Sequence, residues 1–318
     1  IYTTWLGEGN LGGAAQLAVA LLIFVFALLW VERHARKRQS TMPGSRHPMA
    51  PRRTALAGWR GILAMLACIV PVFLGFILPA LILLKFAARH FEDILSPSYF
   101  NAMWHSFTLS LTASLVVVVL GLILAYAYRS QSGRKISNLL RLASVGYAMP
   151  GTVLGIGVLI PLAYFDNSVD AFMRSSFGVS TGLLLSGTIT AIIFAYAIRF
   201  LAISFGSLES GLEKVTPNLT FAARTLGRTP LRTVLEIHLP ILRPALVTAT
   251  LLVFVDCMKE LPATLILRPF DFETLATLVY LLASLGQLEE SAAPALTIVA
   301  AGLIPIILLT RNLRIERI

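Results

Sequence analysis

Three charged residues interrupt an apolar stretch of this chain, where their chemistry is out of place. Asp256, Lys259 and Glu260 fall in a run from residue 245 to 267, with Pro262 just beyond them. On a helix, Asp256 reaches Lys259 at i+3 and Glu260 at i+4, so opposite charges can pair. A charge at the centre of a membrane helix costs about 2.5 kcal/mol or more, and it is expected to face protein or water. The cluster either lines a translocation path or neutralises itself and braces helix packing, and both interpretations stay open. Pro262 is expected to kink or end the helix.

No other residue pattern in the sequence favours catalysis. The chain has no G-x-x-x-x-G-K-[ST] sequence, so it cannot hydrolyse ATP with that kind of phosphate-binding loop. Cys68 and Cys257 each lie in an apolar run and are expected to be small buried side chains. The five histidines are scattered, without the spacing of a metal site. We therefore predict no enzyme activity, no catalytic residue, no metal site and no cofactor in this chain.

The elements that position the charged cluster are expected to be membrane helices. The chain is 57% hydrophobic and only 13% charged, whereas soluble domains carry about a quarter charged residues. Long continuous apolar runs exclude barrel strands, which would alternate. The fold class is therefore all-α, a polytopic helical membrane protein with about seven transmembrane helices. The expected spans are 13–31, 62–84, 105–128, 140–163, 183–203, 245–267 and 294–310.

Basic residues indicate the orientation of these spans. Of the 26 Lys and Arg, 21 fall in four regions that the spans place on one side, 32–60, 129–141, 199–243 and 311–317. Lys and Arg resist translocation, so this side is expected to be cytoplasmic. The N-terminus of this chain is then periplasmic and its C-terminus cytoplasmic. The net charge of +10 belongs to these loops, and no nucleic-acid partner is expected.

Composition also suggests a domain boundary. Residues 39–58 are polar, basic and rich in proline, as expected for a cytoplasmic linker. A faint repeat relates residues 1–17 to 279–296, and each copy precedes an apolar span that ends in arginines. We therefore expect residues 1–38 to be the last helix of a preceding lobe, and 59–318 to be a complete lobe of six helices.

A polar, basic insertion lies between two spans, at about residues 204–244. Two helix-compatible pieces, Thr220–Leu226 and Pro230–Leu239, flank Gly227, which permits the positive φ of a tight reversal. Pro240 and Pro244 are expected to limit the second piece and redirect the chain toward the bilayer. The residues alone leave two interpretations open. One is a short helix presented to a soluble partner, and the other is an amphipathic helix on lipid headgroups.

Glycines in the fourth span offer a further packing signal. Gly151, Gly155 and Gly157 provide a small-residue face for close helix contact, whereas Pro150 and Pro161 could break the helix near a transport path. Close packing is the preferred interpretation.

The insertion "AARTLGRTPLRTVLEIHLP" resembles the signature loop of ABC-type importer permeases. That loop has Glu-Ala-Ala, three residues, Gly, nine residues, Ile, one residue and Leu-Pro. The matching positions here are Ala222, Ala223, Gly227, Ile237, Leu239 and Pro240. Phe221 stands where the family usually has Glu, a departure that concerns the polar contact of that residue and not the fold of the loop.

This resemblance implies the ABC importer permease fold with cytoplasmic coupling helices. In that family the loop docks on a cytoplasmic ATPase dimer, which binds the ATP and Mg²⁺, and transmits its closure to the membrane helices. It also implies a periplasmic substrate-binding protein and another permease lobe, on the same natural chain or as a second copy, in the bacterial inner membrane.

A second stretch resembles the ferric-iron branch of these permeases. It is "KELPATLILRP" with the following "F-ET-LAT", and a closing "PAL…GLIP" in the last span. The resemblance implies import of ferric iron, although no residue pattern by itself indicates iron. Two alternatives remain. The cargo could be another small ligand, such as a polyamine, thiamine or an oxyanion. The chain could instead be an ion-coupled secondary transporter that uses the charged cluster.

Overall fold

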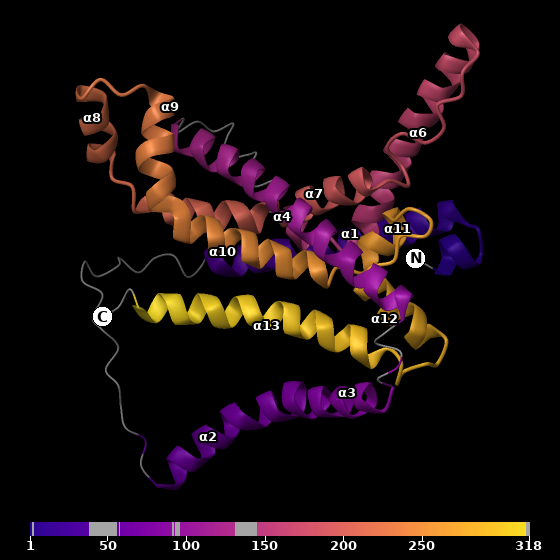
Figure 1. Ribbon diagram of the computed structural model, residues 1–318, viewed down its shortest axis with the longest axis horizontal. Helices are drawn as coiled ribbons and strands as arrows, with labels where there is room; N and C mark the ends of the chain where they lie inside the picture. Colours follow the sequence, from indigo (N-terminus) through magenta and orange to yellow (C-terminus); the bar gives the residue numbers. More distant parts are fainter. Residues whose placement is uncertain are drawn as a thin grey trace.

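The computed structural model is helical wherever it describes the chain (Figure 1). It describes residues 1–37, 56–92, 96–130 and 145–315, apart from Tyr2, Ala57 and Phe91. No strand occurs in these ranges. Most of the expected linker 39–58, and the start of the expected fourth span, lie outside the described residues. The all-α prediction is confirmed.

Six helices in the described ranges are long and apolar enough to cross a membrane. They are α1 (Leu11–Lys37), α2 through η2 and α3 (Trp59–Arg89), α4 (Pro97–Ser130), α6 (Gly151–Phe177), α7 (Ile189–Glu213) and α9 through η4 and α10 (Pro230–Met258). The seventh expected span lies in α13 (Ala292–Ile315), whose apolar part, Ala292–Ile307, is shorter than the other six. The remaining helices are η1 (Thr3–Gly7), α8 (Pro217–Thr225), α11 (Pro262–Leu267) and α12 (Leu275–Ser284).

Three of the predicted spans differ most clearly from the structure, and one of them is the fifth, 183–203, whose helix α7 is Ile189–Glu213. α6 begins at Gly151, directly after Pro150, and continues through Pro161 to Phe177. The sixth span was expected to reach residue 267, but its helix α10 ends at Met258 and the chain restarts as α11. Pro150 directly precedes α6, and Pro262 is the first residue of α11. At these positions the backbone N–H has no partner within the helix, so its absence in proline costs no hydrogen bond.

Small side chains hold the centre of the bundle. α4, α7 and α10 pack on one another, and fully buried residues at their contacts include Ala113, Ala195 and Ala249. Lipid tails are as apolar as leucine, so helices associate in a membrane chiefly by close van der Waals packing, which small residues permit. The three helices therefore form the rigid frame of the chain.

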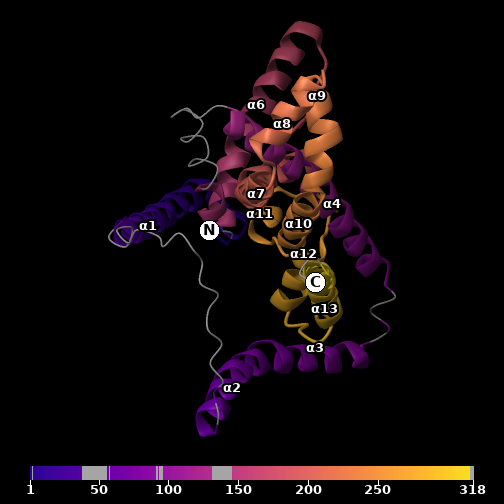
Figure 2. The same ribbon diagram turned by 90° about the vertical axis from the view of Figure 1, so that its left-hand side faces the viewer.

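α2 and α3 lie apart from this frame, as Figure 2 shows. α3 packs on α13, but α2 has no buried residue. Cys68, which was expected to be buried, is exposed on α2 because no other described helix covers it.

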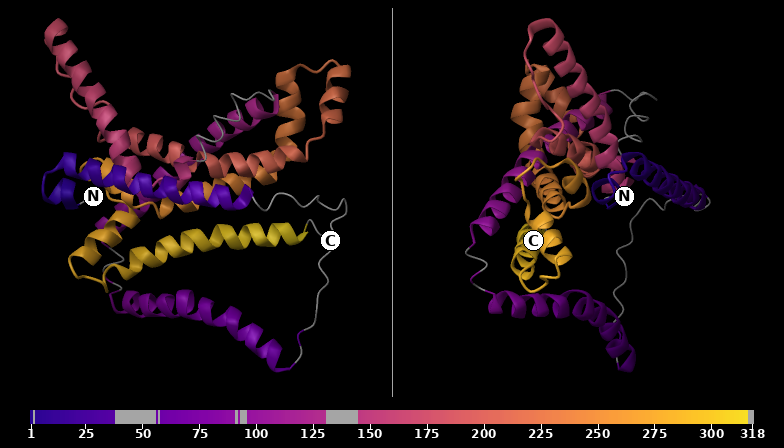
Figure 3. Two further views of the ribbon diagram at one scale, coloured as in Figure 1. Left: turned by 180° about the vertical axis from the view of Figure 1, so that it is seen from behind. Right: turned by 90° about the vertical axis from the view of Figure 1, so that its right-hand side faces the viewer.

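The ends of the membrane helices separate into two groups along the long axis of the molecule. The last turn of α1, the first turn of α2, and the ends of α4 and α13 lie at the same end as α8 and α9 in Figures 1 and 3. These helix ends thus share one side, as the sequence predicted for the regions that they border. Which side faces the cytoplasm stays a prediction.

Candidate functional site

The inserted hairpin begins with α8, which ends in a left-handed turn at Gly227. The N–H of Gly227 bonds the carbonyl of Arg224, and the N–H of Arg228 bonds the carbonyl of Ala223, both at 3.0 Å. This pair of bonds caps a helix when the residue after its end adopts positive φ, and Gly227 has φ 75°. The space where its Cβ would lie is open, so another residue would meet backbone strain and no clash. The predicted turn is confirmed.

The second arm of the hairpin starts at a capped turn. The side chain of Thr229 accepts a hydrogen bond from the N–H of Arg232, and Pro230 occupies the first position of α9 (Pro230–Thr233). The two predicted pieces are therefore both helical, although the first begins at Pro217, three residues earlier than expected.

Pro240 does not end the second arm. The chain runs from α9 through a π-helical turn, η4 (Val234–His238), into α10 without leaving the helical conformation. The N–H of Leu239 bonds the carbonyl of Val234, five residues back, in this wider turn. In Figure 1 the column changes direction sharply between α9 and α10. The expectation that Pro240 and Pro244 stop the helix is wrong, because the π-turn and a bend accommodate them, but the expected redirection of the chain is present.

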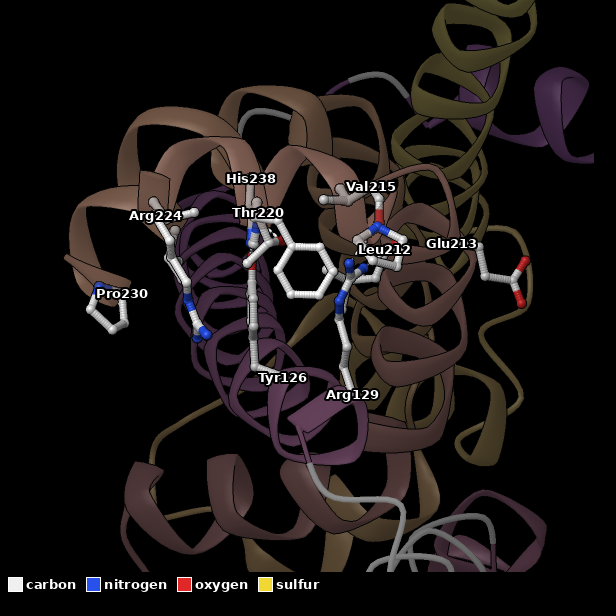
Figure 4. A pocket seen from close by; sticks show the side chains of 13 residues that line it. Tyr126, Arg129, Leu212, Glu213, Val215, Thr220, Arg224, Pro230 and His238 are labelled. Atoms are coloured by element: carbon white, nitrogen blue, oxygen red, sulfur yellow. Dashed lines mark hydrogen bonds between the residues drawn. The ribbon is translucent and has the colours of Figure 1, made fainter. Parts of the chain in front are cut away.

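A cavity of about 820 Å³ lies between the hairpin and the ends of α4 and α7 (Figure 4). Phe221 and Arg224 on α8 line it, together with Tyr126 and Arg129 on α4. Arg129 donates hydrogen bonds to the carbonyls of Leu212 and Val215, both at 2.6 Å, at the end of α7.

His238 joins the hairpin to the membrane helices at this cavity. Its Nε2 lies 3.2 Å from the hydroxyl of Thr220 on α8, and its Nδ1 lies 3.1 Å from the hydroxyl of Tyr126 on α4. The ring also stacks on Tyr126, with centroids 5.9 Å apart. One buried side chain therefore links both arms of the hairpin to α4. The sequence analysis missed it because the histidine has no partner close to it in the chain.

The charged cluster at the end of α10 divides into two separate pairs. The Nζ of Lys259 lies 2.7 Å from a carboxylate oxygen of Asp256, the i+3 pair that the sequence predicted. The Lys259 side chain is 62% exposed. Glu260 does not join this pair, because the helix has already ended at Met258 and its side chain points elsewhere.

Glu260 is buried and pairs with Arg199 of α7. Its carboxylate lies 3.3 Å from the Arg199 Nε, and only 7% of its side chain is exposed. It also accepts a hydrogen bond from the N–H of Ala263 at the start of α11, at 3.2 Å. Arg199 in turn donates to the carbonyl of Met149 at 2.8 Å, just before α6. This ion pair therefore ties three helices at the point where α10 breaks.

The helices around this ion pair approach closely. A Cβ on Gly151 would lie 2.5 Å from the Glu260 carboxylate, and a Cβ on Gly155 would lie 3.0 Å from Ile266 of α11. The predicted close packing is confirmed at these two glycines, whereas Gly157 has no neighbour within 4 Å. The Tyr196 and Thr264 hydroxyls, 2.6 Å apart, add a second buried link between α7 and α11.

Arg199 was assigned to a cytoplasmic loop from the sequence, and this is wrong. It lies in the middle of α7, and the helix continues to Glu213. The apolar residues that follow it, as far as Leu208, were a signal that the span continues past residue 203.

The residues predicted for coupling form one structural unit. Ala223 is buried in the hairpin, Ala222 and Pro240 are exposed, and Ile237 and Leu239 are half-buried along the second arm. Those predicted for a path are Asp256, Lys259, Glu260 and Pro262, and they lie together at the α10–α11 break. The roles of both groups stay predictions. Within the described ranges, no three His, Cys, Asp or Glu side chains gather closely enough to hold a metal ion.

The chain is similar to bacterial transport permeases of several kinds. No protein-family model matches it. It is 26% identical over 226 residues to a putative 2-aminoethylphosphonate transport system permease of Salmonella paratyphi A, covering 71% of this chain and 79% of that protein. It is 29% identical over 252 residues to a putative ferric transport system permease of Haemophilus influenzae, covering 76% of this chain and 39% of that protein.

Solved structures with the same fold are ABC transporters. A bacterial ABC transporter that imports the polysaccharide alginate superposes with a TM-score of 0.60 at 15% identity, covering 80% of this chain and 94% of that one. The same transporter type in complex with an alginate-bound periplasmic protein gives a TM-score of 0.57 at 14% identity, over 78% and 92% of the two chains. The fold of this chain is therefore that of an ABC importer permease.

Proposed function

We propose that this chain, with its ABC importer permease fold, is the transmembrane permease of an ATP-driven importer that carries ferric iron across the bacterial inner membrane. Its homologues are permeases of import systems, and the ferric transport permeases among them support the cargo. The basic ends of the membrane helices face the cytoplasm in this proposal, and the N-terminus of this chain is periplasmic.

One observation carries the coupling role. From Pro230 to Met258 the backbone is a single helical column, whose first turn belongs to the exposed hairpin and whose last turn abuts the α10–α11 break. At about 1.5 Å per residue, the path along this column is about 40 Å long, with the sharp bend between α9 and α10 included in it. A displacement of the hairpin therefore reaches the opposite end of the membrane helices without passing through a loop. The hairpin is the part that an external motor would move.

The proposed partners follow from this assignment. A cytoplasmic ATPase dimer, with its ATP and Mg²⁺, supplies the hydrolysis that this chain does not perform. A periplasmic binding protein delivers the cargo. One of the superposed transporters supports this proposal, because its crystal structure contains a periplasmic protein bound to it. A further permease lobe, on the same natural chain or as a second copy, completes the pathway, since the ferric permease of H. influenzae is more than twice as long as the region matched here.

The hairpin assignment is tested with Gly227→Asp. An aspartate is tolerated at φ 75° with little strain, but it places a negative charge at the tip of the hairpin, so binding of the ATPase and ATP-dependent uptake should both be lost. Gly286 is a matched control, because it has φ 79°, open space around it and the same capping bonds, but it follows α12 at the other end of the molecule. Gly286→Asp should keep ATPase binding. Full binding and coupling in Gly227→Asp would refute the role of the hairpin.

Transport class and cargo are separated in proteoliposomes. The importer requires the ATPase and the binding protein for uptake of radiolabelled ferric iron, whereas an ion-coupled secondary transporter moves cargo with neither. Uptake of 2-aminoethylphosphonate and not of iron, with the same requirement for ATP, would keep the importer and replace its cargo.

A further inference from the structure

The cavity between the hairpin and the membrane helices lies where two of those helices end. α4 ends at Ser130 and α7 at Glu213, and both contribute residues to the cavity wall (Figure 4). Both are apolar enough to cross a membrane, so their ends lie at the level of lipid headgroups. The cavity volume of about 820 Å³ falls within the range of about 300–1,000 Å³ that is usual for small-molecule pockets. The space is therefore suited to a ligand the size of a lipid headgroup.

Two arginines give this cavity a positive charge. Arg224 reaches it from α8 and Arg129 from α4 (Figure 4). Arg129 donates to the carbonyls of Leu212 and Val215, which do not neutralise its charge. Among the described residues, neither arginine has a carboxylate within ion-pair distance. Glu213 also lines the cavity, but its carboxylate points away from both arginines in Figure 4. The cavity therefore favours an anionic ligand.

The rest of the wall is largely apolar. Its apolar residues are Leu212, Val215, Pro217, Pro230 and Val234. Phe221 extends this wall, and its side chain is 59% exposed. Glutamate, which is usual at this position in the importer loops that the hairpin resembles, would place a negative charge three residues from Arg224 on the same helix and would oppose binding of an anion. With phenylalanine, the cavity combines positive charge with apolar surface.

We propose that this cavity binds one anionic phospholipid. The phosphate lies at Arg224 and Arg129, and the first part of the acyl chains contacts Phe221 and the apolar wall. Basic pockets between membrane helices bind anionic headgroups in this way on the cytoplasmic side. The inference rests on the proposed function only for the cytoplasmic orientation of this end. A soluble phosphate ester shares the phosphate chemistry, but the apolar wall next to two membrane helices favours a lipid.

The test counts lipids retained by the full chain, without ATPase or cargo. The chain is purified in mixed micelles of phosphatidylglycerol and phosphatidylcholine, and native mass spectrometry measures the bound lipid. The native chain should retain one phosphatidylglycerol. Arg224→Gln should weaken its retention about fivefold, the effect expected of one basic residue near anionic lipid. Phe221→Glu should weaken it at least as much, whereas Phe221→Leu should keep it. Arg129 is left in place, because it also holds the end of α7.

Each of these changes has a matched control in the same hairpin. Arg232→Gln removes the same charge from α9, and Leu226→Glu adds the same charge at an 81% exposed position, and neither residue lines the cavity. Both controls should retain the lipid as the native chain does. Equal losses in controls and cavity variants would indicate general attraction to the surface and would overturn the proposal.

Two further outcomes would also overturn the lipid site. One is a native chain that retains no phosphatidylglycerol, and the other is displacement of the lipid by excess glycerol phosphate, which would assign the cavity to a soluble phosphate ester. Neither outcome affects the importer if ATP-dependent uptake of iron is intact. Failure of that uptake in a chain that retains its lipid would refute the proposed function and leave the lipid site.

Discussion

The hairpin and the α10–α11 break both contain charged residues in a largely apolar chain, but they are built in opposite ways. The turn of the hairpin is held by contacts between residues close in the chain, His238 links the hairpin to Tyr126 of α4, and the charged side chains of the turn are exposed. The break is held by a buried ion pair between residues far apart in the chain. A hairpin of this kind can move without exposing a buried charge. The break, by contrast, cannot open without separating the buried Arg199 from Glu260. The comparison suggests that the hairpin is a moving part and that the α10–α11 break is a fixed part. Substitutions in the two regions should distinguish these roles.

The largest effect is expected at Arg199, in the fixed part. Arg199→Leu leaves the Glu260 carboxylate buried without its cation, which should cost about 3–5 kcal/mol of stability. The midpoint of unfolding in a detergent titration measures this. The double variant Arg199→Leu/Glu260→Gln removes both charges and should recover much of the loss. A single variant as stable as the native chain would show that the ion pair does not hold the break.

A smaller loss is expected from Gly151→Ala. The added Cβ would meet the Glu260 carboxylate at 2.5 Å and the Arg199 guanidinium at 3.2 Å, so the pair must shift, at about 1–3 kcal/mol. Gly157→Ala lies on the same helix with open space around it and should be neutral in the same titration. Equal midpoints for the two variants would contradict the close approach of α6 to the break.

His238→Ala tests the boundary between the two regions. It removes the contacts to Thr220 and Tyr126, worth about 1–2 kcal/mol, and detaches α8 from α4. We expect the ATPase to remain bound and to hydrolyse ATP with reduced uptake per ATP, because the hairpin then moves without its link to α4. Tyr126→Phe keeps the stacked ring but loses the hydroxyl, so its uptake per ATP should lie between that of His238→Ala and that of the native chain. An unchanged ratio of uptake to hydrolysis would show that this joint transmits nothing.

The smallest effect on stability is expected at Lys259. Its side chain is mostly exposed, so Lys259→Gln should cost below about 1 kcal/mol although Asp256 loses its partner. If the pair lines the path, uptake falls while stability and ATPase binding stay near native. Unchanged uptake in this variant would leave only the packing role for the pair.

The same contrast explains what the sequence could predict. The hairpin turn was found because Gly227 and Pro230 act on their own neighbours, and such local rules need no tertiary information. The Asp256–Lys259 pair was found for the same reason. Glu260 was assigned to the wrong partner, because its true partner, Arg199, is brought to it only by packing of α7 against the break.

The bounds of the helices show a similar limit. Proline was a good guide at Pro262, where α11 begins, but a poor one at Pro240, where a π-turn absorbs it, and the expected span 140–163 ran through Pro150, just before α6 begins. Whether a proline ends a helix or bends it depends on the room that neighbouring helices leave, and a sequence read alone does not contain that information.

The uncovered circumference of α2 has a consequence for its rotation about its own axis. Every one of its side chains, from Trp59 to Val72, escapes burial by the rest of the described chain. No contact there fixes which side chain points inward, so in the isolated chain a spin-label scan along α2 should give even lipid accessibility with no helical periodicity. If lipid accessibility along α2 acquires a period of 3.6 residues on assembly, the protected positions identify the face that contacts a neighbouring subunit.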